Sequence, residues 1–313
     1  MKSELARYLQ ITLRILGFMR CAKRVGWAAC HFLAVVLILG IFSPARAEGP
    51  YFVTYDHHME EPGSLEVNIS PVFGVPKAGN GFVGSATEFE YGVKGWWTTE
   101  FCLDGQQTWR ESTVFTGFRW ENRFRLLMNE HRINPVLYVE FENINEADKT
   151  FKEVVGFDSG LDNIEPNSET RREKEREIET KLILSSDLKG WNVSENLIAE
   201  KVLNAPEPWE FGYAFGANRP LALAASARDC NFCRENIRAG FEMFGGLGDR
   251  HNFSLHGTSH YFAPILSWTL TNGTTLSFSP AFGLTHESHR ALLRVGVSYE
   301  IPSFGRSLRR AFR

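Results

Sequence analysis

Charged side chains recur at every second position of many segments whose other positions are apolar. Alternation of this kind is typical of β-strands with one apolar and one polar face. If the polar face lines a water-filled lumen, carboxylates and guanidinium groups at strand centres select solutes by charge. The candidate lumen residues are Glu88, Glu90, Arg119, Glu121, Arg123, Glu140, Glu142, Arg238, Glu242 and Arg294.

Histidines are concentrated in two segments between predicted strands. They are His251, His256, His260, His286 and His289. Imidazole suits copper, zinc and nickel, and the last strands of a closed barrel are neighbours, so these side chains could line one sector of a rim. Near the N-terminus, His57-His58-Met59 resembles the metal-rich N-terminal region of outer-membrane copper-resistance barrels. Metal binding or metal resistance is therefore one alternative function.

Cys230-Asn231-Phe232-Cys233 is a C-x-x-C motif. No second such motif and no directly following histidine is present, which argues against a zinc ribbon and a c-type haem site. In an exported protein the two cysteines are predicted to form a local disulfide. The sequence predicts no cofactor.

A barrel enzyme acting on lipid is a further alternative. Ser254, His256, Ser259 and His260 supply the residue types of a nucleophile and a base. Their spacing matches no lipase motif, so we expect a protein without enzymatic activity.

Alternation predicts about twelve strands between residues 64 and 301. In the last one, Leu293, Val295, Val297, Tyr299 and Ile301 share one face. A third strand is expected over 96–103, ending at Asp104-Gly105, and the fourth is expected to place Val114, Thr116, Phe118 and Trp120 on its apolar face. Asn272-Gly273 predicts a two-residue hairpin turn, and residues 219–227 have a helical composition.

The connections differ in length between the two ends that these strands would form. Three of the five connections on the side of the termini are tight, whereas the longest, residues 145–176, lies opposite. Short turns at one end and long loops at the other are typical of outer-membrane barrels. Residues 145–176 are a candidate lid or plug.

The predicted fold class is all-β: a transmembrane antiparallel up-and-down β-barrel of about 12 strands. The alternative is a secreted soluble β-sandwich that binds a ligand, because alternation alone fits both. Charges at strand centres, interleaved with glycines such as Gly212, Gly240 and Gly296, favour the hydrated lumen of a barrel.

Residues 1–47 read as a signal peptide. Basic residues precede an apolar run over 25–42, and Ala45-Arg46-Ala47 is a cleavage site; translation starts at Met1 or Met19. Residues 48–63 would lead into the barrel, 64–301 would form it, and 302–313 would be a basic tail.

The charge balance changes when the signal peptide is removed. Residues 1–47 hold seven of the chain's 34 basic residues and one of its 37 acidic residues, so the remainder has a net charge of about −9. This charge argues against a nucleic-acid partner.

The pattern Arg294-x-Gly296-x-x-Tyr299-x-Ile301 resembles the terminal-strand signal of bacterial outer-membrane proteins. It departs from that signal because Ile301 is not aromatic and twelve residues follow it. The resemblance implies recognition by the barrel-assembly machinery and a location among outer-membrane lipids. The chain is also similar to outer-membrane barrels described as transporters, including the family named for a phenol-degradation pathway. We therefore expect a passive channel or transporter-like protein for small solutes.

Overall fold

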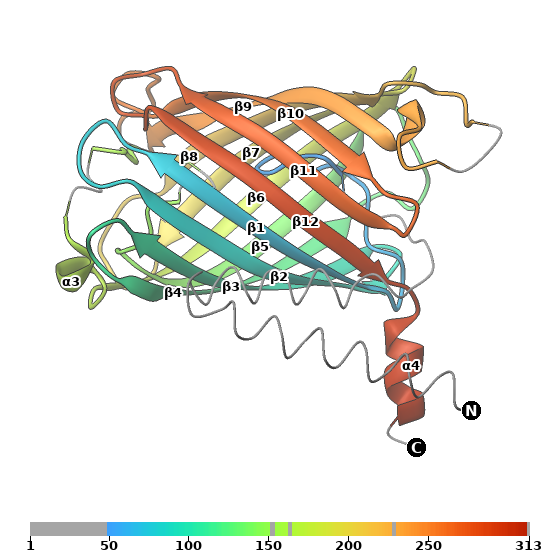
Figure 1. Cartoon of the computed structure of the whole chain (residues 1–313). Coiled ribbons are helices and arrows are strands. Elements are labelled where there is room, and N and C mark those ends of the chain that lie inside the picture. The colour runs from blue at the N-terminus through green and yellow to red at the C-terminus, as the bar shows by residue number, and fades with distance from the viewer. Residues whose placement is uncertain (1–48, 151–153, 162–164, 227–229, 312–313) are drawn as a thin grey trace. The chain divides into compact units, whose positions relative to one another are not determined.

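The chain folds into a closed barrel of twelve antiparallel strands (Figure 1). This computed structural model describes residues 49–150, 154–161, 165–226 and 230–311, and the predicted signal peptide lies outside them. Each strand pairs with the next along the chain, and β12 closes the barrel on β1. The predicted up-and-down barrel is confirmed. The strands are β1 (Leu65–Val75), β2 (Phe82–Lys94), β3 (Trp97–Thr108), β4 (Thr113–Arg125), β5 (Asn134–Asn145), β6 (Lys174–Leu188), β7 (Trp191–Val202), β8 (Glu210–Pro220), β9 (Ile237–Asp249), β10 (His260–Thr269), β11 (Thr274–Gly283) and β12 (Ala291–Ile301).

The helices of the described residues are short and lie in connections between strands or after β12. They are α3 (Asn167–Thr170), η3 (Arg234–Asn236) and α4 (Phe304–Ala311). None of the helices in the described ranges is long and apolar enough to cross a membrane. The expected helix over 219–227 is wrong in its described part, because β8 continues to Pro220 and residues 221–226 form bends.

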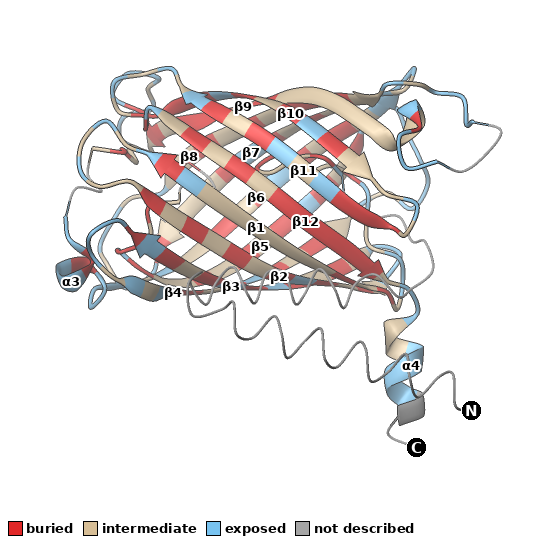
Figure 2. Ribbon diagram, viewed as in Figure 1, coloured by how far each residue is buried: buried red, intermediate tan, exposed pale blue. Residues whose placement is uncertain are grey.

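Large apolar side chains cover the outside of the barrel, and the burial pattern alternates along each strand (Figure 2). A soluble protein rarely exposes so many of them, whereas a lipid-facing band consists of them. The closed wall and this outer surface argue against the soluble sandwich. Exposed apolar residues on the strands include Phe89, Phe101, Leu103, Trp120, Leu137, Leu182, Leu197, Phe262, Leu266, Phe278 and Phe282.

A bulge between β3 and β4 corrects two expectations. The pairing register shifts between Asp104 and Gly105, and β3 continues to Thr108 instead of turning. Opposite the shift, Thr116 faces inward, where its hydroxyl donates to Asp148 Oδ2 at 2.9 Å. Thr116 is therefore on the polar side of the wall, and Phe118 and Trp120 remain outside.

The two ends of the barrel differ as predicted. At the end where β1 begins and β12 ends, called the terminus end, Lys189 and Gly190 form a two-residue turn with φ of 51° and 84°. The turn at Gly273 is longer than expected, because Leu270 accepts a hydrogen bond from the Gly273 amide and Gly273 alone has a positive φ of 87°. The opposite end, called the far end, carries the long connection between β5 and β6.

Candidate functional site

Residues 49–63, here called the N-terminal segment, run inside the barrel before β1 begins (Figure 1). Glu242 on β9 holds this segment by accepting hydrogen bonds from three consecutive backbone amides. The distances to its nearer oxygen are 3.2 Å from Phe52, 2.9 Å from Val53 and 2.8 Å from Thr54. The segment thus obstructs the lumen that it was expected only to lead into.

Tyr55 is the second anchor of the N-terminal segment. Asn196 on β7 accepts from its amide at 2.6 Å and donates to its carbonyl at 2.8 Å. The Tyr55 hydroxyl donates to Glu121 at 3.0 Å, and the Lys181 ammonium lies 4.6 Å from the centre of its ring. A cation over an aromatic face stabilises this position further. The wall residues around Tyr55 therefore hold it by hydrogen bonds and by a cation–π contact.

The connection between β5 and β6 folds into the far end of the barrel. The Lys149 amide donates to Gln106 on β3 at 2.8 Å, and the Gly156 amide donates to the Phe211 carbonyl on β8 at 3.0 Å. Val154 and Val155 are buried against inward-facing apolar residues that include Val53, Phe82, Phe244, Tyr261 and Leu292. This part of the connection packs inside the barrel at the far end, and Tyr261 belongs to the same interior cluster.

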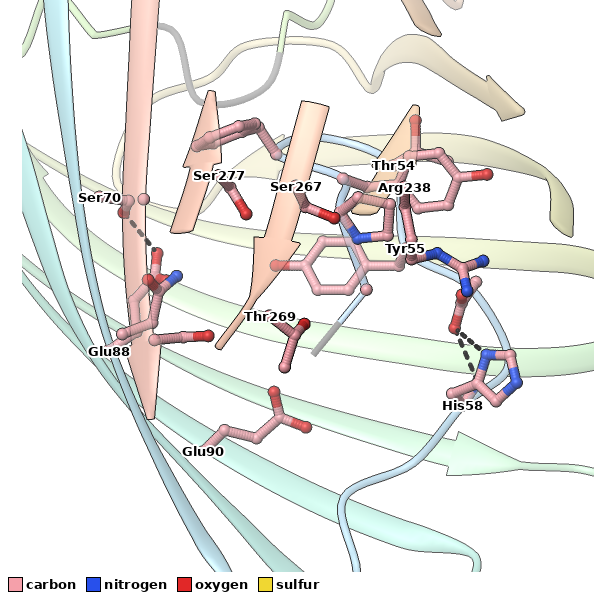
Figure 3. Close-up of a pocket in the computed structure, with 18 of the residues that line it drawn as sticks. Thr54, Tyr55, His58, Ser70, Glu88, Glu90, Arg238, Ser267, Thr269 and Ser277 are labelled. Carbon is pink, nitrogen blue, oxygen red and sulfur yellow. Dashed lines mark hydrogen bonds and ion pairs between the residues drawn. The ribbon is translucent and has the colours of Figure 1, made fainter. Parts of the chain in front are cut away.

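A cavity of about 980 Å³ lies between the N-terminal segment and the wall (Figure 3). Strands β1–β4 and β9–β12 contribute most of its wall residues, and the connection over 221–236 lines it at the terminus end. In Figure 3, Glu88 and Glu90 stand on one side while Ser267, Thr269 and Ser277 stand on another. Its lining combines charged and hydroxyl side chains with apolar ones such as Val72 and Leu223.

Ten acidic residues form a continuous series across ten neighbouring strands. Each member lies directly opposite the next in the pairing register, and the series runs from the terminus end on β12 to the far end on β9. We call this series the carboxylate ladder. In order it consists of Glu300, Glu66, Glu90, Glu100, Glu121, Glu140, Glu179, Glu200, Glu210 and Asp249. Directly opposed side chains have Cβ atoms about 5 Å apart, and like charges at that distance repel, so the ladder attracts cations.

Three basic residues partly neutralise the ladder. Arg123 pairs with Glu90 and lies 3.7 Å from Glu100, and Lys181 lies 2.9 Å from Glu179. Arg119 pairs with Asp104 at 2.9 Å and lies 3.7 Å from Glu140. The ten acidic groups of the ladder outnumber these three cations.

All ten candidate lumen residues occupy inward-facing positions. Six of them line the cavity: Glu88, Glu90, Arg119, Arg123, Arg238 and Arg294. Glu121 accepts a hydrogen bond from the Tyr55 hydroxyl, and Glu242 accepts from the backbone amides of the N-terminal segment. Glu140 and Glu142 lie on the side of the barrel where β5 pairs with β6. The expectation that these residues set selectivity stays a prediction. The lumen is also less hydrated than expected where Val136, Tyr138 and Ile183 pack around Tyr55.

The five loop histidines do not converge on one point in the described part of the chain. His251, His256 and His286 are exposed at the far end. The His260 ring meets Tyr213 and Thr258 hydroxyls at 3.2 and 2.9 Å, and burial lowers the pKa of His289 to about 4. Among the described residues, the groups that could hold a metal contain none of the five.

The serines of the 250–260 connection do not meet its histidine rings. The Ser254 hydroxyl donates to the His256 carbonyl at 3.3 Å, and the Ser259 hydroxyl donates to the Asp158 carbonyl at 2.7 Å. This geometry offers no support for a lipase site there.

Cys230 and Cys233 form a disulfide in the connection between β8 and β9. Cys102 faces inward on β3, and its thiol lies 3.2 Å from Glu100 Oε1 and 3.5 Å from Glu121 Oε1. It is buried beside the carboxylate ladder.

Sequence reasoning found individual glutamates but missed the ladder and both anchors. Alternation predicted which glutamates at strand centres face inward. Which of them lie opposite one another on neighbouring strands depends on the pairing register, and alternation does not determine that register. The backbone amides at 52–54 carry no sequence signal at all.

No model of a protein family and no curated protein matches the sequence. Solved structures with some likeness include an outer membrane channel from Pseudomonas putida F1, with 10% identity, TM-score 0.49 and coverage of 79% of this chain and 98% of that one. The NanC porin has 8% identity, TM-score 0.46 and coverage of 76% and 100%. The outer membrane phospholipase A from Escherichia coli has 10% identity, TM-score 0.39 and coverage of 83% and 95%. The resemblance to the transporter family named for phenol degradation stays a prediction.

Proposed function

We propose that this protein is an outer-membrane channel for small cationic solutes, which pass when the N-terminal segment leaves the lumen. The carboxylate ladder carries this proposal, because it presents one acidic side chain on each of ten neighbouring strands from one end of the barrel to the other. Acidic residues that line a pore favour cations. The exposed apolar belt supports a place in a membrane.

The gate is inferred from the way in which the N-terminal segment is held. Its contacts to Glu242, Asn196 and Glu121 are hydrogen bonds, and its apolar contacts are divided between two separate clusters, at Val53 and at Tyr55. Such bonds can be exchanged for bonds to water, so the segment can leave without unfolding the strands. Glu121 belongs to the ladder, so departure of Tyr55 also uncovers part of the cation path.

Planar-bilayer recording of the purified protein in a salt gradient tests the proposal. We expect a cation-selective reversal potential, with longer open periods after deletion of residues 49–60. In Glu121→Gln/Glu140→Gln, which alters the ladder midway, we expect selectivity for cations to fall severalfold. Glu195→Gln, on a half-buried position of β7 outside the ladder, is the matched control.

Two results would contradict the proposal. One is the absence of conductance in the deletion variant while the barrel remains folded, judged by heat-dependent migration in gels. The other is an unchanged reversal potential in the double ladder variant. A lipid-hydrolysis assay on the same samples tests the enzyme alternative.

A further inference from the structure

Two adjacent histidines of the N-terminal segment lie together at the terminus end. The chain bends at His57, and the rings of His57 and His58 are tilted by 31° to each other, with centroids 4.3 Å apart. His57 is 1% exposed, whereas the side chain of His58 is 60% exposed. The five candidate metal ligands of the sequence analysis are other histidines, and His57 and His58 entered there only through the resemblance of His57-His58-Met59 to a metal-rich N-terminal region.

One nitrogen of each ring is held by a neighbouring oxygen. Ser185 Oγ lies 2.8 Å from His57 Nδ1, and Asp56 Oδ1 lies 3.0 Å from His58 Nδ1. Metal-binding histidines are usually oriented in this way through the nitrogen that does not bind the metal. The arrangement leaves Nε2 of each ring for another ligand.

Each Nε2 atom faces a carboxylate from the barrel. His57 Nε2 lies 2.9 Å from Glu130 Oε1, and His58 Nε2 lies 3.3 Å from Asp187 Oδ2. Asn192 donates to the other Asp187 oxygen at 2.8 Å and fixes that carboxylate. Two imidazoles and the fixed Asp187 carboxylate form a donor set that suits zinc and similar ions.

We propose that His57, His58 and Asp187 bind a divalent transition metal of the zinc class. One ligand atom from each of the three lies within 4.8 Å of the others. Ligands of a tetrahedral zinc ion are about 3.4 Å apart, given bonds of about 2.1 Å, so small side-chain movements suffice. The exposed sides of His58 and Asp187 give an ion access from water.

The metal would join the N-terminal segment to the wall, because the histidines belong to the segment and Asp187 belongs to β6. Bound metal would therefore keep the segment in the lumen. This second step rests on the proposed channel function, whereas metal binding itself does not.

Calorimetric titration of the untagged, detergent-purified protein with Zn²⁺ tests the binding step. We expect one ion per chain, with affinity reduced about 100-fold or more in His57→Ala/His58→Ala, and reduced roughly 10–100-fold in Asp56→Ala, which removes an orienting contact. His131→Ala, an exposed histidine at the same end, is the matched control and should bind like the unaltered protein. Electron paramagnetic resonance with Cu²⁺ should show nitrogen ligation that disappears in the double variant.

Lack of stoichiometric Zn²⁺ binding, or equal binding by the folded double variant, overturns the metal site. Recording with and without Zn²⁺ then tests the second step separately. Closure by Zn²⁺ in the unaltered protein but not in the double variant supports it. Binding without any change in open probability overturns the coupling and leaves the metal site intact.

Discussion

In the proposed channel, Glu242 is the residue on which the closed state depends most directly. Its carboxylate accepts from the amides of residues 52–54, and hydrogen bonds to a charged acceptor contribute about 1.5–3 kcal/mol each. Part of that energy is recovered from water when the segment leaves. A neutral amide at this position would lose the charge and replace one acceptor by a donor.

We therefore expect Glu242→Gln to raise the open-to-closed ratio of the channel by about tenfold, which corresponds to roughly 1.4 kcal/mol. Single-channel open probability measures this ratio. Glu61→Gln, an exposed residue of the same segment, is the control. An open probability equal to that of the unaltered protein would show that Glu242 does not hold the segment.

Glu60 gives the closed state a dependence on pH. Burial, together with the carboxylates of Glu90, Glu66 and Glu300, raises its pKa to about 10, although Arg123 acts in the opposite direction. In the released segment the pKa should return toward 4.5, the usual value. Between these two values only the released segment loses its proton, so the closed state weakens as the pH rises.

We expect open probability to increase from pH 5 to pH 9 in the unaltered protein, and to increase less in Glu60→Gln, where the side chain cannot ionise. Recording both proteins at three pH values isolates the contribution of Glu60 from that of the ladder. Identical pH profiles in the two proteins would show that Glu60 does not contribute to the pH dependence.

At the scale of elements, the strands are long and rigid while their short turns fix the register. Gly190, between β6 and β7, has a φ of 84°, and a Cβ there would approach a Leu223 side-chain carbon to 2.3 Å. A left-handed backbone costs an L-residue about 1–2 kcal/mol. Gly95 lies in another turn at the same end, and a Cβ there would meet no atom within 4 Å.

Gly190→Ala should therefore destabilise the barrel by about 1–2 kcal/mol, whereas Gly95→Ala should change stability by much less. Urea unfolding in detergent, followed by tryptophan fluorescence, compares the two variants. Equal midpoints would show that the turn adapts to a side chain.

Alternation located the strands well, because a wall between lipid and a polar interior forces a period of two. It failed at Thr116, where a bulge adds one residue and reverses the faces. It also gave no hint that residues 49–63 turn back into the lumen. The segment is held through its own backbone amides, which donate to side chains more than a hundred positions away in the sequence, such as Asn196.

At the scale of the whole molecule, closure and register create properties that no single strand has. Glu121 and Glu140 were both expected to face the lumen, but only the pairing of β4 with β5 makes them opposite neighbours. Repeated across the wall, such pairs give a charged path from end to end. The number of strands and the polar interior could be predicted from the sequence, whereas this path required the three-dimensional register.

The rate at which thiol reagents modify Cys102 should report how often the N-terminal segment leaves the lumen. Its thiol lies beside Glu100 and Glu121, under the Tyr55 anchor. A positively charged thiol reagent should modify it faster than a negatively charged one of the same size, because the surrounding carboxylates concentrate cations. Modification should accelerate in Glu242→Gln, and mass spectrometry of timed samples would then follow the movement of the segment in whole membranes, through a native cysteine and without electrodes.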